Sequence, residues 1–125
     1  MRILHLSDLH ASPAVPFSLI EKSIQLGLEA KPDVISIDWN ADLLDIKKSL
    51  PAGIAVQGNL DPHILYADKA VIKERIHRLF DRMKGENGFI FNLGHGIMPD
   101  IPFDHVKYAV EVIKEYPSSN PLRGE

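Results

Sequence analysis

The chain has 125 residues, 45% of them hydrophobic, which suffices for one domain with its own core. A formal net charge of −3 argues against nucleic acid or an anionic membrane as a partner. The absence of cysteine excludes disulfides and thiolate metal sites and favours a reducing, cytoplasmic setting, and no apolar run approaches the roughly 20 residues that span a bilayer.

Short apolar runs alternate with helical patterns along the whole chain. The predicted elements are, in order, strand 2–6, helix 18–30, strand 34–37, helix 41–50, strand 54–56, helix 69–83, strand 89–93 and helix 102–116. Strands that are joined through helices pair in parallel with right-handed crossovers. The sequence therefore predicts an α/β fold of four consecutive βα units around a parallel sheet.

Polar residues mark the starts of two of these helices, and apolar stripes mark their inner faces. Asn40 is the expected N-cap of the second helix, and Asp68 that of the third. The third helix is expected to bury Ile72, Ile76, Leu79, Phe80 and Met83. The last helix is expected to turn Phe103, Val106, Val110 and Ile113 inward.

The carboxyl ends of parallel strands lie on one edge of a sheet, which is where α/β folds place their binding sites. The polar residues that follow the four strands are Asp8, His10, Asp38, Asn40, Asn59, Asp61, Asn92 and His95. This edge is the predicted functional surface.

The stretch 88–96 brings a buried strand and a glycine-framed histidine together. Gly94 and Gly96 flank His95, and they permit either a positive φ or a close approach of the backbone to a ligand. We therefore expect His95 to line a pocket.

Residues 35–116 resemble the C-terminal part of uroporphyrinogen decarboxylases. The similarity lies in Ser36-Ile-Asp-Trp39, Val56-Gln-Gly-Asn-Leu-Asp-Pro62 and Phe89-Ile-Phe-Asn-Leu-Gly-His-Gly96, in that order. The resemblance implies a (β/α)₈ barrel that removes carboxylates from tetrapyrrole acetate side chains without a cofactor. It also implies a porphyrinogen pocket, of which the remnant here would be His95, Asn92, Gly94, Gln57 and Asp38.

The chain departs from that family in its N-terminal part. The arginine-rich substrate loop of the family, and the aspartate that holds the pyrrole nitrogens, have no counterpart here. An octa-acid needs several cations as partners, and the predicted strand edge shows none.

Residues 1–35 are similar instead to the opening of calcineurin-like metallophosphoesterases, through Met1-Arg-Ile-Leu-His-Leu-Ser-Asp-Leu-His10. In that family the D-x-H pair, here Asp8 and His10, helps to ligate two metal ions that activate water. The resemblance implies a site for Mn²⁺ or another divalent ion formed by Asp8, His10, Asp38, Asn59 and His95. The family has a histidine where this chain has Leu60.

Together, the two resemblances predict an engineered chimera with its junction near 33–38, one domain over 1–116 and a flexible tail over 117–125. The first hypothesis is a chimeric protein without natural catalytic activity, which keeps a remnant pocket for a porphyrinogen-like molecule. The alternatives are a weak metal-dependent phosphoesterase and, last, uroporphyrinogen decarboxylation itself.

Four βα units form half of a (β/α)₈ barrel of about 250 residues. A half barrel left alone exposes the inner face of its sheet, at about 1.5–3 kcal/mol for each large apolar side chain. The sequence therefore favours self-association into a homodimer that closes the barrel, and a flavodoxin-like open sandwich is the alternative.

Overall fold

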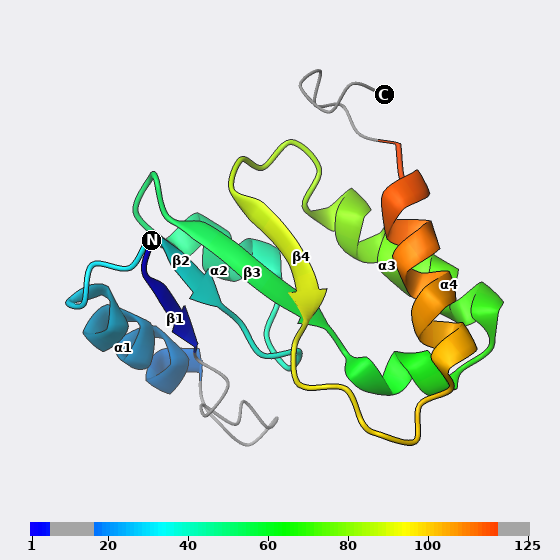
Figure 1. Cartoon of the computed structure of the whole chain (residues 1–125). Coiled ribbons are helices and arrows are strands. Elements are labelled where there is room, and N and C mark those ends of the chain that lie inside the picture. The colour runs from blue at the N-terminus through cyan, green and yellow to red at the C-terminus, as the bar shows by residue number, and fades with distance from the viewer. Residues whose placement is uncertain (6–16, 118–125) are drawn as a thin grey trace.

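The computed structural model describes residues 1–5 and 17–117, with only the backbone described for 17–21 and 23, and contains one parallel sheet (Figure 1). The elements are β1 (Ile3–His5), α1 (Phe17–Leu28), β2 (Val34–Ser36), α2 (Leu43–Ser49), β3 (Ala55–Leu60), the 3₁₀ helix η1 (Pro62–Tyr66), α3 (Lys69–Arg82), β4 (Phe89–Leu93) and α4 (Phe103–Glu115). No helix in this part of the chain has both the length and the apolar character to cross a bilayer.

The strands lie in the sheet in the order in which they occur in the chain, β1-β2-β3-β4, and each neighbouring pair is parallel. Right-handed crossovers between sequential parallel strands place all connecting helices on one face, as in a (β/α)₈ barrel. A flavodoxin-like sheet instead reverses its strand order part-way. The predicted half-barrel architecture is therefore confirmed, and the flavodoxin-like alternative is not observed.

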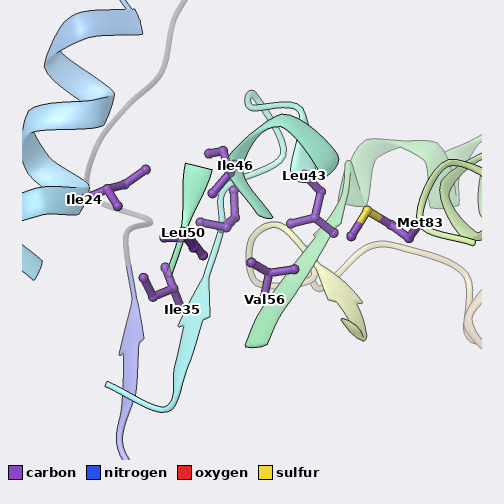
Figure 2. Close-up of a cluster of buried hydrophobic side chains, with 8 residues drawn as sticks. Ile24, Ile35, Leu43, Ile46, Leu50, Val56 and Met83 are labelled. Carbon is purple, nitrogen blue, oxygen red and sulfur yellow. The ribbon is translucent and has the colours of Figure 1, made fainter. Parts of the chain in front are cut away.

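The face of the sheet that carries the helices forms the core. Ile35 and Val56 are register partners, both fully buried, and Phe89 is the next partner in the same row. Figure 2 shows Ile35 and Val56 among buried side chains from α1, α2 and the end of α3. These are Ile24, Leu43, Ile46, Leu50 and Met83, and Ile37, which directly follows β2, belongs to the same cluster.

A second cluster joins α3, η1 and α4 to Leu60 at the end of β3. Ile72 and Ile76 are fully buried on α3, which confirms the predicted inner face of that helix. Phe80 links this cluster to the sheet, because its ring stacks on Phe91 of β4 with 5.3 Å between the ring centroids.

Within the described part of the chain, no helix lies on the opposite face of the sheet (Figure 1). Its side chains form two rows, because register partners point the same way and alternate residues point to opposite faces. Ile3, Val34 and Ala55 form an apolar row, and His5, Ser36, Gln57 and Ile90 form a mostly polar one. This open face corresponds to the interior of a closed barrel.

The predicted inner face of α4 is wrong at two positions. The side chain of Phe103 is 81% exposed and that of Val110 is 44% exposed, whereas Ala109 and Val112 are buried. The reason is that α4 packs chiefly on α3 and η1, and among the described residues no strand lies beyond β4 to receive the Phe103 side of the helix.

The N-cap of α2 also differs from the prediction. Asp42 caps the helix, because its Oδ1 accepts a hydrogen bond from the Asp45 amide at 3.0 Å. The Asn40 amide instead donates to the Asp38 carboxylate. Asp68 does occupy the N-cap position of α3, but its side chain makes no capping hydrogen bond.

We expect Asp42→Ala to lower the free energy of unfolding by about 1 kcal/mol, because the Asp45 amide loses its acceptor. Asp68→Ala is the matched control and should change the unfolding free energy far less, since no capping bond is lost. Urea unfolding followed by circular dichroism measures both. Equal losses in the two variants would contradict the assignment of the cap.

Candidate functional site

A hollow of about 540 Å³ lies where the open face of the sheet meets the connection from β4 to α4. Its lining comes from β1, the end of β2, the end of β4 and the connection that follows, and α4. The lining residues are His5, Ser36, Ile37, Asn92, Leu93, Gly94, His95, Gly96, Ile97 and Val106. We call this region the sheet hollow. It brings together three of the predicted pocket residues, Asn92, Gly94 and His95.

His95 is the second residue after β4 and is exposed at the sheet hollow. Its Nδ1 is 3.4 Å from the carbonyl oxygen of Gly96. The imidazole is thus presented to the hollow and is not packed into either core cluster.

Gly94 is buried, and the lack of space beside its α-carbon explains why the residue is a glycine. A β-carbon at this position would lie 2.3 Å from the Trp39 backbone nitrogen, and the Gly94 amide donates to the Leu60 carbonyl at 2.7 Å. Neither Gly94 nor Gly96 has a positive φ. The prediction that these glycines permit a positive φ is therefore wrong. Gly94 serves a close approach to Trp39 in the turn after β2, whereas a β-carbon on Gly96 would meet nothing within 4 Å.

Asn59 and Asn92 are register partners with different roles. Asn92 is exposed, and its Oδ1 accepts from the amide of Leu93 at 2.9 Å. Asn59 is buried, and its Nδ2 donates to the carbonyl oxygens of Asp38, at 3.0 Å, and Ala41. Asn59 therefore fixes the turn between β2 and α2.

Two of the predicted pocket residues, Gln57 and Asp38, do not line the sheet hollow. Gln57 is half-buried in the polar row of the open face, beside Ser36. Asp38 is buried, and its carboxylate accepts a hydrogen bond from the backbone amide of Asn40 at 3.3 Å.

The structure adds two residues to the predicted site. His5 and Ser36 are register partners on β1 and β2, and both line the sheet hollow. The sequence suggests a packed histidine at position 5, but the side chain is exposed. The period-two spacing of Ile3 and His5 puts both on one face. Only the register with β2 shows that this is the open one.

The lining of the sheet hollow contains no lysine or arginine. A group of arginines lies on α3, where Arg75, Arg78 and Arg82 line a separate groove of about 240 Å³ with Trp39 and Asp61. Their spacing of three and four residues places them on one side of the helix. Acidic side chains already pair with them: Arg82 lies 3.2 Å from Asp42, and Glu74 contacts both Arg75 and Arg78.

Hydrogen bonds hold the segments that follow β3 and β4. The carboxylate of Asp61 accepts from the His63 amide at 2.9 Å and lies 2.7 Å from its Nδ1. The Tyr66 hydroxyl donates to Asp100, which ties η1 to the segment before α4. This hydrogen bond raises the pKa of Tyr66 above its usual value.

The predicted metal site is only partly within the described structure. Asp8 and His10 lie outside the described residues. Of the others, Asn59 is bound to backbone carbonyls and Asp38 to Asn40, while His95 lies at the sheet hollow. Within residues 1–5 and 17–117, no cluster of three or more histidine or acidic side chains could hold a metal ion.

Comparison with known proteins identifies a family whose model matches most of the chain. The model described as uroporphyrinogen decarboxylase (URO-D) matches residues 18–116. The chain is 46% identical over 86 residues to the uroporphyrinogen decarboxylase of Pelobacter propionicus, covering 69% of this chain and 25% of that protein. It is 36% identical over 116 residues to the enzyme of Aquifex aeolicus, covering 92% of this chain and 34% of that protein. The chain thus spans about a quarter to a third of these relatives.

The family match also bears on the predicted junction near 33–38. The matched range begins at residue 18 and continues through this segment to residue 116. One family therefore matches both sides of the predicted junction, and an origin of the chain in two families stays a prediction.

Proposed function

Because the chain belongs to the uroporphyrinogen decarboxylase family, we propose that it supplies four βα units of a barrel that binds a carboxylated tetrapyrrole. The sheet hollow is then one wall of the binding pocket. Partners that complete the barrel would supply the other wall.

The placement of His95 and Asn92 in the sheet hollow carries this proposal. Both come from the Asn92-Leu-Gly-His-Gly96 stretch on which the family resemblance rests. Ligand sites combine apolar walls with a few placed polar groups. Leu93, Ile97 and Val106 offer apolar surface to a tetrapyrrole ring, and His5, Ser36, Asn92 and His95 offer polar groups to its carboxylates.

We expect binding without decarboxylation by this chain alone. Carboxylates are held most strongly by arginine and lysine, and the lining of the sheet hollow has neither. Its two histidines donate to a carboxylate more weakly when neutral than when charged. An engineered origin, with residues 1–35 taken from a second family, would be consistent with this lack of cations. Such a chain would keep one wall of the binding pocket and lack the half of the barrel that holds the substrate. No cofactor is part of this proposal.

We predict that His95→Ala weakens the binding of uroporphyrin, the oxidised octacarboxylate, about tenfold, because a hydrogen bond to a charged group contributes about 1.5–3 kcal/mol. Quenching of porphyrin fluorescence during titration with the protein measures the affinity. His77→Ala is the matched control, since His77 packs edge-on to Tyr116, with 5.2 Å between their ring centroids, away from the sheet hollow.

Two results would count against the proposed site. If the wild-type protein does not bind the porphyrin, the binding function is wrong. If His77→Ala weakens binding as much as His95→Ala, then the porphyrin binds elsewhere on the surface.

A further inference from the structure

Apolar side chains remain exposed at the β4 end of the sheet. Phe103 and Val110 lie two helical turns apart, so they share one side of α4, and both are exposed. Ile90 of β4 and Ile97 in the connection to α4 are exposed as well, at 40% and 47%. A strand and a helix at one end of the fold thus present an apolar surface to solvent.

The β1 end of the sheet has the same character. Ile3 of β1 is exposed, and Leu26 of α1 is 64% exposed. Only two of the 12 residues of α1 are charged, Glu21 and Lys22, although the solvent-facing side of a surface helix normally carries many charges. In Figure 1, α1 lies next to β1 at one end of the sheet, and α3 and α4 lie at the other.

The two ends of the sheet are complementary. All four strands run parallel, and among the described residues no strand pairs with the outer edge of β1 or of β4. The free edge of β4 in one chain can therefore pair in parallel with the free edge of β1 in another. Two such junctions, related by a two-fold axis, give eight parallel strands, the number that closes a barrel whose interior side chains fill.

We propose that the protein closes its barrel with a second copy of itself, the β4–α4 end of each chain joining the β1–α1 end of its partner. One contact, repeated by two-fold rotation, covers both exposed ends without a third component. It places Val110 of one chain near Leu26 of the other at each of two junctions. The proposal rests on the sheet and its exposed ends, and is independent of any ligand.

The mass of the protein in solution tests the proposal first. Size exclusion with light scattering should give 28.0 kDa, twice the 14.0 kDa of one chain. Val110→Lys and Leu26→Glu should each give the monomer mass, because each places a charge at both junctions. Val71→Lys makes the same change as Val110→Lys at a 38% exposed valine on α3, away from the two junctions, and should remain a dimer.

Mixing the two monomeric variants tests the geometry of the junctions. In a mixed pair, Lys from Val110→Lys meets Glu from Leu26→Glu at one junction, while the native valine and leucine meet at the other. The mixture should therefore regain the dimer mass, although each variant alone is a monomer. Circular dichroism of each variant shows that its helices and sheet are intact.

Three outcomes would overturn the proposal. These are a monomeric wild-type protein, a dimer that survives Val110→Lys and Leu26→Glu as it survives Val71→Lys, and folded variants that stay monomeric when mixed. Porphyrin binding is read separately, from fluorescence with the His95→Ala variant.

Discussion

Gly94→Ala should lower the free energy of unfolding by about 3 kcal/mol, at the upper end of the usual cost of overpacking a core. The added β-carbon would lie 2.3 Å from the Trp39 nitrogen and within 2.7 Å of the Trp39 α-carbon. These atoms belong to the backbone, so no rotation of a side chain can relieve the contact. The ends of β2 and β4 would have to move apart, and the Gly94 amide would lose its bond to Leu60.

Gly96→Ala is the matched control, two residues away on the other side of His95. Its β-carbon would meet nothing within 4 Å, and its φ is not positive, so its unfolding free energy should change by less than about 0.5 kcal/mol. Chemical unfolding of both variants measures the difference. Similar losses would mean that a general need for glycine in this turn, and not the contact with Trp39, sets the cost.

Asn59→Asp should lower the free energy of unfolding by about 2–4 kcal/mol, because the buried carbonyl of Asp38 and the half-buried carbonyl of Ala41 lose their donor, at about 1–3 kcal/mol for a buried group. The change keeps the shape of the side chain. It replaces an amide that donates to the carbonyls of Asp38 and Ala41 with a carboxylate that faces the same oxygens. The turn from β2 into α2 should loosen first.

Asn92→Asp is the control for this variant, since Asn92 is the register partner of Asn59 and is exposed. Its amide oxygen accepts from Leu93, a role that a carboxylate oxygen can fill, so its stability should change little. Urea unfolding at pH 7 compares the two. A larger loss for Asn92→Asp would show that the buried amide is not what holds the turn.

The parts of the fold that follow from local patterns could be predicted. The short apolar run 89–93 and the stripe along 69–83 became a strand and a helix, and parallel pairing followed from their alternation. Beyond the predicted end at 56, β3 continues to Leu60. Glycine and asparagine there indicated a turn, whereas pairing with β4 keeps this segment extended.

Helix α4 shows where periodicity is insufficient. Its sequence carries one apolar stripe through Phe103 and Val110 and another through Ala109 and Val112. The spacing of apolar residues cannot show which of the two stripes is buried. The helix buries the stripe with Ala109 and Val112 because α3 and η1 are its neighbours. The decision depends on which elements adjoin the helix in space.

In the candidate site, too, the sequence could identify some residues and could not identify others. Asn92, Gly94 and His95 could be grouped because they end one strand in the sequence. His5 and Ser36 could not be added without the register of β1 on β2. The role of Gly94 depends on Trp39, which lies in the turn after β2, a strand that is not adjacent to β4.

The contact between Gly94 and Trp39 also bears on the order of folding. It joins segments distant in the chain, and it requires β3 to be in place between β2 and β4. Contacts of high sequence separation bring a larger loop-closure entropy and tend to form late. We therefore expect the surroundings of His95 to be among the last parts of the molecule to become native, so that the magnetic resonance signals of its imidazole report completion of the whole sheet.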